Sequence, residues 1–451
     1  MAGEALGDSV NRGWLYHPSF PEDWTPRPLH SMASWVNGIA FKDIQFTLTG
    51  RPVIKIAEIK GGLSGQTKFT QQTFDESVCV RPGDLLFSWS GQPETSIDAF
   101  WWRGPEGWLN QHVFRVTPED GIDTVFFYYL LRYLKPNFIG IARNKQTIGL
   151  GHVTKRDLEN LEVAYPELPE QRAIAHILGT LDDRIEANRR MAATLEEMAR
   201  ALFRAWFVTF EPVRAKAEGR WRPGQTLPGL PASLYDTFPD RLVETEHGEI
   251  PKGWDFKPLS GIAEFLNGLA LQKFPATNLA DSLPVIKIAE LRNGVSEKCD
   301  RASRALPPQY IVRDGDFLFS WSGSLLAKFW TEGDGALNQH LFKVTSQHYP
   351  AWFFSEWVQH HLEEFQRIAS FKATTMGHIQ RGHLDAAMTC CPPDQTIARL
   401  GAFIAPLVSR TVLTALETRN LTTLRDTLLP KLVSGAIRVK DAEAFLKARG
   451  L

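Results

Sequence analysis

The sequence predicts an α+β fold in which two similar α+β domains are separated by two long antiparallel coiled-coil helices, as an internal repeat with pseudo-twofold symmetry. Two observations predict this architecture. A set of motifs recurs in the same order about 230 residues further along the chain. In addition, each copy is followed by a stretch with apolar residues at alternating steps of three and four.

The repeat is clearest in motifs rich in β-branched residues and bounded by Gly, Asp or Asn, which are typical of β-strands. The matching pairs are Val53–Ile59 with Val285–Leu291, Arg81–Gly91 with Arg313–Gly323, Asn110–Val116 with Asn338–Val344, and Gly151-His152 with Gly377-His378. Residues 126–134 and 352–365 are expected to form short helices after the strands. Each half of the chain is therefore predicted to be one α+β domain.

Long helices are expected after Leu168-Pro-Glu-Gln171 and Pro393-Asp-Gln395, because a proline followed by an acidic residue suits a first helical turn. The second helix is expected to be interrupted near Pro406 and ended near Pro430. The residues predicted to pair the helices are Ile174, Leu178, Leu181, Ile185, Asn188, Leu195, Leu202, Leu413, Leu416, Asn420, Leu424 and Leu428. Asn188 is the polar residue that would set the register at some cost in stability.

These patterns divide the chain into seven segments. The divisions are an N-terminal tail (1–13), a first domain (14–165), a central helix (166–210), an irregular connector rich in proline and glycine (211–250), a second domain (251–391), a C-terminal helix (392–436) and a C-terminal tail (437–451).

Composition is that of a soluble protein with several domains: 451 residues, 43% hydrophobic and 22% charged. The net charge of −1 gives no overall positive field, so any binding of nucleic acid must use local basic surfaces or a partner. We expect a cytoplasmic protein, because the N-terminus lacks a signal-peptide pattern, the apolar run Val125–Leu131 is too short for a bilayer, and four cysteines form no framework.

Five ordered motifs resemble the specificity subunits of type I restriction-modification enzymes. They are Pro169–Arg172, Ala201–Phe207, Phe210–Lys216, Gly248–Trp254 and Leu428–Arg438. The resemblance implies a phage-defence protein in which two target-recognition domains each recognise one part of a split double-stranded DNA target. It further implies that the helices act as spacer and bind two methyltransferase subunits, through which restriction subunits join. A helix of about 35 residues is roughly 50 Å long, enough to span one DNA turn of about 34 Å.

Base recognition is expected in the stretches that differ between the repeats, because different bases need different donors and acceptors. Three pairs of stretches are expected to be such loops: 60–77 with 292–309, 92–109 with 324–337, and 140–150 with 366–376. The candidate DNA-binding residues are Lys60, Gln66, Lys68, Gln71, Arg143, Asn144, Lys145 and Gln146 in the first half, and Arg292, Asn293, Lys298, Arg301, Arg304, Lys328 and Lys372 in the second. Some of them are expected to be merely solvated.

Ser88–Gly91 and Asn110–His112 are polar and occur twice, so they could be DNA contacts or turns of a shared scaffold. We favour the scaffold, since the two parts of a target usually differ while scaffolds stay alike. No catalytic residue and no metal site is expected: the repeated histidines lack accompanying ligands, and neither a Walker loop nor a methyltransferase Asn/Asp-Pro-Pro-aromatic motif occurs. S-adenosylmethionine, ATP and Mg²⁺ are expected in the partner subunits. The alternatives are a subunit serving methylation alone, and a coiled-coil adaptor that does not recognise DNA.

Overall fold

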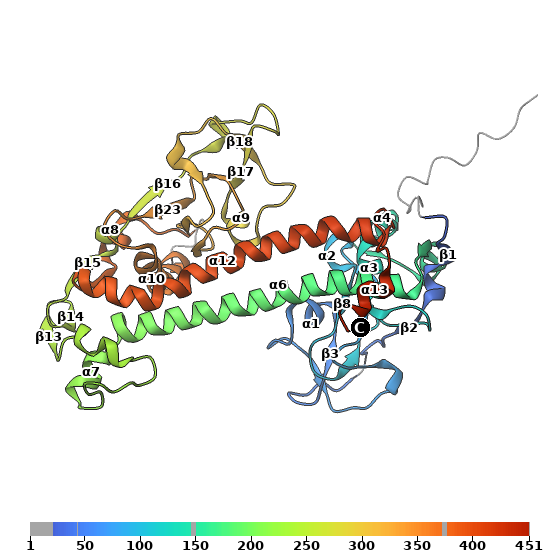
Figure 1. Cartoon of the computed structure of the whole chain (residues 1–451), viewed down its shortest axis with the longest axis horizontal. Helices are drawn as coiled ribbons and strands as arrows, with labels where there is room; N and C mark the ends of the chain where they lie inside the picture. The colour runs from blue at the N-terminus through green and yellow to red at the C-terminus, as the bar shows by residue number, and fades with distance from the viewer. Residues whose placement is uncertain (1–20, 43, 146–149, 372–376, 451) are drawn as a thin grey trace, which may run out of the picture. The chain divides into compact units, whose positions relative to one another are not determined.

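A computed structural model describes residues 21–42, 44–145, 150–371 and 377–450 (Figure 1). The chain divides into two compact units. The first unit comprises residues 1–183 and 422–451, and the second comprises 184–421. Helix α6 (Leu168–Phe203) passes from the first unit into the second, and helix α12 (Asp394–Val433) passes back.

The first unit is built on two four-stranded sheets. One has the order β2-β10-β6-β8 and is antiparallel throughout; the other has the order β4-β3-β9-β5, with β3 and β9 parallel. The strands are β1 (Thr25–Pro28), β2 (Ala33–Asn37), β3 (Arg51–Ile54), β4 (Phe69–Thr70), β5 (Cys79–Val80), β6 (Leu85–Ser88), β7 (Ser90–Gly91), β8 (Asp98–Trp101), β9 (Gly107–Leu109), β10 (Val113–Pro118), β11 (Gly151–His152) and β12 (Glu162–Tyr165). The helices are α1 (Ile56–Gly61), α2 (Pro93–Ser96), α3 (Thr124–Tyr133), α4 (Lys135–Asn144), α5 (Lys155–Asn160) and α13 (Ala442–Lys447).

The second unit repeats this topology. Its sheets have the orders β16-β23-β20-β21 and β18-β17-β22-β19, and the pair β15-β24 corresponds to β1-β12. The strands are β13 (Leu242–Thr245), β14 (Gly248–Pro251), β15 (Asp255–Pro258), β16 (Glu264–Asn267), β17 (Ser282–Ile286), β18 (Arg301–Ser303), β19 (Ile311–Val312), β20 (Phe317–Ser320), β21 (Ala327–Phe329), β22 (Gly335–Leu337), β23 (Leu341–Thr345) and β24 (Met388–Cys391). The helices are α7 (Glu211–Ala217), α8 (Leu259–Ile262), α9 (Ile288–Asn293), α10 (Ala351–Phe371) and α11 (Arg381–Ala386). The predicted α+β repeat is confirmed.

Repeated polar residues hold the same turns in both units. The Glu58 carboxylate accepts the Lys55 amide at 3.1 Å, and Glu290 accepts the Lys287 amide at the same distance, so each starts a short helix. Asp84 accepts the amide of Arg81 at 2.7 Å in the turn before β6. These contacts explain why the motifs recur: they begin and end elements that both domains share.

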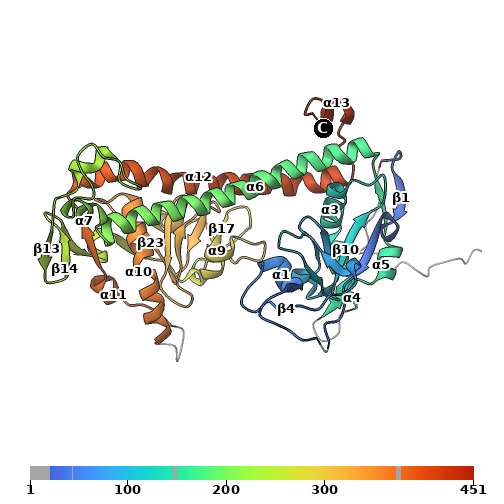
Figure 2. The same ribbon diagram turned by 90° about the horizontal axis from the view of Figure 1, so that it is seen from below.

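Helices α6 and α12 pair antiparallel within each unit (Figures 1 and 2). In the first unit the Arg425 guanidinium donates to Asp182 at 2.7 Å. In the second unit Arg184 donates to Glu417 at 3.0 Å, and the rings of Trp206 and Phe403 lie 6.1 Å apart. Residue numbers rise along α6 as they fall along α12, which confirms the predicted orientation.

The expected interruption near Pro406 is wrong, since α12 is helical from Asp394 to Val433. Pro406 is exposed, and the residues on both sides are held by packing: Ile404 is buried before it and Thr414 after it. Packing on both flanks therefore outweighs the cost of the missing hydrogen bond.

Part of the predicted seam in α12 is also wrong. Leu413 and Leu424 are exposed, at 56% and 46%, and Asn420 is exposed too, whereas Thr414 is buried. The buried and half-buried positions of α12 continue past Pro406 at the spacing set by Ile397, Leu400 and Ile404. Beyond the proline they include small Thr and Ala side chains, so a search for regularly spaced leucines does not find them. In α6, the predicted Ile174, Leu178, Ile185 and Asn188 are buried, while Leu181, Leu195 and Leu202 are half-buried.

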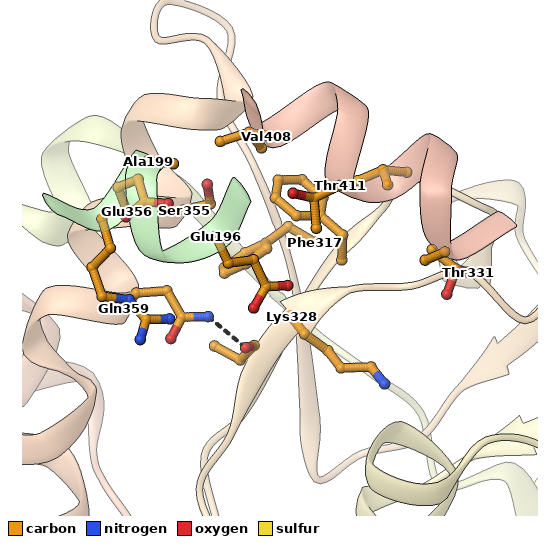
Figure 3. Close-up of a pocket in the computed structure, with 15 residues that line it drawn as sticks. Glu196, Ala199, Phe317, Lys328, Thr331, Ser355, Glu356, Gln359, Val408 and Thr411 are labelled. Carbon is orange, nitrogen blue, oxygen red and sulfur yellow. Dashed lines mark hydrogen bonds between the residues drawn. The ribbon is translucent and has the colours of Figure 1, made fainter. Parts of the chain in front are cut away.

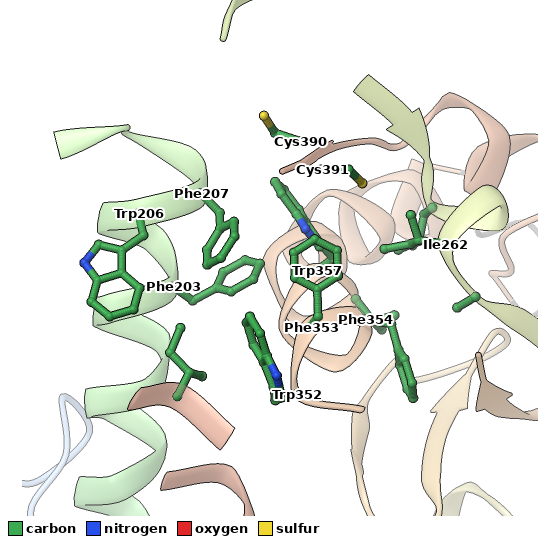
Figure 4. Packing of buried hydrophobic residues seen from close by; sticks show 14 of the residues in the cluster. Phe203, Trp206, Phe207, Ile262, Trp352, Phe353, Phe354, Trp357, Cys390 and Cys391 are labelled. Atoms are coloured by element: carbon green, nitrogen blue, oxygen red, sulfur yellow. The ribbon is translucent and has the colours of Figure 1, made fainter. Parts of the chain in front are cut away.

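A large aromatic core joins α6 to the second unit (Figure 4). Phe203 meets Trp357 of α10 edge to face with ring centres 5.1 Å apart, and Phe207 meets Phe353 at 5.5 Å. Residues 204–208 form a π-helical turn at this junction. Such turns re-aim side chains, and here both Trp206 and Phe207 become buried.

The segment 211–250 is less irregular than expected. It contains α7 and the hairpin β13-β14, and Trp221 and Phe238 are buried in the core of the second unit. Its proline and glycine content favours loops, but its aromatic residues supply enough apolar surface to fold. Beyond α12, the expected C-terminal tail likewise contains α13.

By length and composition, α12 is the one helix in the described part of the chain that could cross a membrane. The expectation that no segment is apolar enough was based on uninterrupted apolar runs and missed α12, in which threonines separate the apolar residues. Helix α12 forms ion pairs with other parts of the protein: Arg419 pairs with Asp314, and Arg425 pairs with Asp182 of α6.

Candidate nucleic-acid interface

In the first unit, several predicted residues gather around α2. The Lys60 ammonium at the end of α1 donates to the Thr95 carbonyl, and Arg143 of α4 pairs with Glu94 at 2.5 Å. Both cations remain exposed. Asn144 is exposed at the end of α4, and Lys145 turns to Asp157, 2.5 Å away. The tertiary structure thus joins Lys60 and Arg143, which are distant in sequence.

A second group in the first unit flanks strand β4. Lys68 precedes the strand and lies over the Phe46 ring at 5.9 Å, and the Gln71 amide donates to the Thr49 hydroxyl at 3.5 Å. Gln66 is exposed in the turn before them. All three can present donors to a ligand along one sheet edge.

In the second unit the matching edge strand is β18. Its Arg301 donates to the Ser282 hydroxyl at 2.9 Å, and Arg304 pairs with Asp334 at 3.1 Å. Arg292, Asn293 and Lys298 are exposed at the end of α9 and in the following turn. Gln146 and Lys372, also predicted, lie outside the described residues.

One of the three expected pairs of loops, 92–109 with 324–337, does not consist of loops. Residues 92–109 contain β8 and β9, and residues 324–337 contain β21 and β22. Their side chains differ between the repeats because a strand position specifies only which face is buried, and many side chains satisfy that. The mismatch between repeats was therefore wrongly interpreted as loop structure.

Lys328 lies away from the other predicted residues. It is half-buried on β21 and lines a cavity of about 370 Å³ between α6, α10 and α12 in the second unit (Figure 3). Glu196 and Arg200 of α6 and Glu356 of α10 line the same cavity. Burial raises the pKa of Glu356 to about 7, an effect that Arg200 opposes and Glu196 reinforces.

Glu356 predicts a pH dependence of stability. Its folded-state pKa of about 7 exceeds the ordinary value of 4.5. Between these two pH values, the folded protein therefore keeps a proton on Glu356 that the unfolded chain has already released. The contribution of Glu356 to stability should therefore fall as pH rises between these values, by on the order of 2 kcal/mol. Desolvation lowers the pKa of His360 to about 4, which makes the contribution of that residue rise with pH. In urea unfolding, the change in stability from pH 5 to pH 8 should be more positive for Glu356→Gln than for the unaltered protein, whereas Glu363→Gln on the exposed side of α10 should match the unaltered protein. An unchanged slope in Glu356→Gln would contradict the assignment.

The repeated Trp and His motifs form the same polar cluster in both units. Trp89 donates to the Asn37 side chain at 3.0 Å, and Trp321 donates to Asn267 at 2.8 Å. Next to each indole, a glutamine amide meets the adjacent histidine Nε2: Gln111 with His112 at 3.1 Å, and Gln339 with His340 at 3.4 Å.

Glycine completes this cluster. A Cβ on Gly38 would lie 2.2 Å from the Asn110 carbonyl oxygen, and one on Gly268 would lie 2.2 Å from that of Asn338. The repeated Asn-Gly and Asn-Gln-His motifs thus meet by close backbone contact, which supports the scaffold interpretation. No group of three metal-ligating side chains occurs in the described ranges.

The loops 39–50 and 269–281 escaped the sequence analysis. They also differ between the repeats and lie next to β4 and β18, where Thr47 bridges Phe69 and Pro275 bridges Ala302. The sequence could have revealed these loops, because they are stretches of different sequence between two motifs that both repeats share, Asn-Gly and Val-Ile-Lys-Ile.

Several known proteins are similar to this chain in sequence or in fold. A family model described as the type I restriction modification DNA specificity domain matches residues 21–197. The type I restriction enzyme MjaIX specificity subunit of Methanocaldococcus jannaschii is 25% identical over 353 residues, 74% of this chain and 73% of the relative. The HindI specificity subunit of Haemophilus influenzae is 24% identical over 326 residues, 63% of this chain and 71% of the relative.

A crystal structure of the type I restriction-modification S subunit from M. genitalium shows the same fold. It has a TM-score of 0.51 at 15% identity and covers 92% of this chain and 97% of that one. The matched domain is a DNA specificity domain, and the similar proteins are specificity subunits of type I restriction enzymes. Residues 21–197 match the type I restriction modification DNA specificity domain, and the chain is similar to type I specificity subunits, as its motifs predicted.

Proposed function

We propose that each unit recognises one part of a bipartite double-stranded DNA target, and that α6 and α12 set the spacing and bind two methyltransferase subunits. Restriction subunits join through the methyltransferases. The observation that carries the proposal is the occurrence of one sheet topology twice in a chain whose two long helices pass between the units. S-adenosylmethionine, ATP and Mg²⁺ belong to the partners in this proposal, and the complex works in the cytoplasm.

The matching sheet edges differ in the chemistry that recognises bases. Strand β4 is flanked by Lys68 and Gln71, while β18 carries Arg301 and is followed by Arg304. Glutamine suits the two hydrogen-bonding groups on the major-groove edge of adenine, and arginine suits those of guanine or a phosphate. The two units have the same scaffold but carry different side chains at these sheet edges. This difference supports the proposal that they recognise two different DNA sequences.

Sequencing of methylated sites tests the bipartite target. In cells that carry this chain with its methyltransferase, we expect one motif with two specific parts and an unspecific spacer of constant length. The control is a strain with the methyltransferase alone, which should lack the motif. A continuous motif would contradict the proposal.

An exposed stripe of α6 in the second unit supports the binding of a methyltransferase. Ala187, Met191, Thr194, Met198 and Ala201 follow one another at helical spacing, and all are exposed and uncharged. Met191 and Met198 are 37% and 49% exposed. A water-facing side of a helix is normally charged, so an uncharged exposed stripe indicates a protein contact.

Met191→Glu should weaken methyltransferase binding, because a carboxylate would be buried in an apolar interface. We expect at least a tenfold lower yield of methyltransferase in co-purification and an unchanged unfolding midpoint. Ala193→Glu, which places the same charge on the exposed side that carries Arg190 and Glu197, is the matched control. Equal yields from both variants would rule out this stripe as the interface.

A further inference from the structure

Two leucines stand out by their exposure. Leu48 is 97% exposed and Leu279 is 77% exposed, well above every other large apolar side chain in the described part of the protein. Leu48 lies in the loop between β2 and β3, and Leu279 lies in the matching loop between β16 and β17. A single exposed leucine needs no explanation, but one in each of two corresponding loops does.

Local contacts hold the Leu48 turn in place. Thr47 pairs with Phe69 next to β4, and the Thr47 hydroxyl donates to the Thr49 carbonyl at 2.6 Å, which closes the turn around Leu48. Gly50 has φ +120°, and a Cβ there would lie 2.5 Å from the Thr70 carbonyl. The leucine is thus presented outward from a turn fixed to a sheet edge.

The Leu279 turn reaches the same result with different residues. The Asn278 side chain accepts the Asp281 amide at 2.7 Å, and the Ser282 hydroxyl donates to the Leu279 carbonyl at 2.8 Å. Pro275 bridges Ala302 of β18. The stabilising residues differ between the two turns, and the feature that the turns share is an exposed leucine.

Both turns lie beside the side chains proposed above to contact DNA. Gln71 bonds Thr49 next to Leu48, and Lys68 lies over Phe46, two residues before it. Arg301 bonds Ser282, three residues after Leu279. An apolar tip with amide and cationic neighbours suits a duplex, whose phosphates attract the cations while its stacked bases accept an apolar side chain.

We propose that Leu48 and Leu279 act as apolar wedges that contact the stacked bases of the duplex, one in each part of the target. The inference rests on the proposed bipartite recognition and adds the residues that enter the groove. Inserted leucines partly unstack a base step, and the step's sequence-dependent flexibility then contributes to specificity without a hydrogen bond.

The test uses the complex with its methyltransferase and a duplex containing the methylated motif. Leu48→Ala and Leu279→Ala should each weaken binding about tenfold, since each removes the burial of one leucine side chain. The double variant should lose about a hundredfold. Ile437→Ala, which truncates another exposed apolar residue of the first unit, should stay within twofold of the unaltered complex.

A fluorescent base, 2-aminopurine, placed at successive steps of each part reports unstacking. The unaltered complex should brighten one step in each part, and each alanine variant should lose the signal in one part only. Unchanged affinity and fluorescence in both variants would overturn the proposal. So would loss of the methyltransferase from the complex, because the leucines would then contact protein. A continuous methylated motif from the unaltered complex would contradict bipartite recognition. The wedge proposal is contradicted separately, by the affinity and fluorescence of the alanine variants.

Discussion

Exchanging residues 14–165 for the matching segment of a related specificity subunit is expected to change one part of the methylated motif completely and to leave the other part and the spacer unchanged. The exchanged segment holds every strand of the first unit, so it carries a whole recognition surface with its own sheets. The helices that set the spacing in our proposal remain those of the host chain. Sequencing of methylated sites measures the result.

The donor segment must keep its contacts with α6. In this chain the Tyr129 hydroxyl donates to Asp182 at 2.7 Å, and the Asp123 amide donates to the Gln171 side chain at 2.9 Å. The reciprocal exchange of residues 251–391 is the control and should change the other part of the motif. A single exchange that altered both parts would refute independent recognition by the two units.

Removal of the Arg438 side chain is expected to destabilise the first unit by about 2–4 kcal/mol, because it leaves the buried Glu170 carboxylate without its cation and with the Val439 amide as its remaining donor. The guanidinium donates to Glu170 at 2.9 and 2.6 Å and to Asp23 at 3.0 Å. The Glu170 side chain is only 9% exposed. These two carboxylates raise the pKa of Arg438, which remains charged.

Unfolding in urea compares Arg438→Ala with two controls. Arg438→Lys keeps the charge but cannot bond both carboxylates in the same way, so an intermediate loss is expected. Arg449→Ala removes an arginine that lies over the Phe445 ring and should cost less than about 1 kcal/mol. A loss below about 0.5 kcal/mol for Arg438→Ala would show that the contact does not hold the C-terminal segment against α6.

The repeat and the first long helix could be predicted because both are visible as regular spacing of residues along the sequence. The matching motifs around Val53 and Val285 place the same strand in both sheets. In α6, residues 174, 178, 185 and 188 are buried as the heptad pattern predicts. Type I specificity was likewise evident from the ordered motifs at the ends of the helices.

The seam of α12 could not be predicted in the same way. Leucine spacing favoured Leu413 and Leu424, yet the buried position is Thr414, opposite a helix that carries small alanines. A small residue signals close packing only when the partner surface is known, because its own transfer from water contributes little free energy. Both helices together therefore decide which residues of each helix face the other.

The amino-acid sequence by itself determined the α+β repeat, the two long helices and the resemblance to type I specificity subunits, since each depends on residue types at set intervals. Tertiary structure alone decided that Lys60 and Arg143 meet at α2, that Lys328 lines a cavity, and that Leu48 and Leu279 project from matching turns. These features depend on which surfaces face one another. That is a balance of packing and desolvation between distant segments, and no local pattern encodes it.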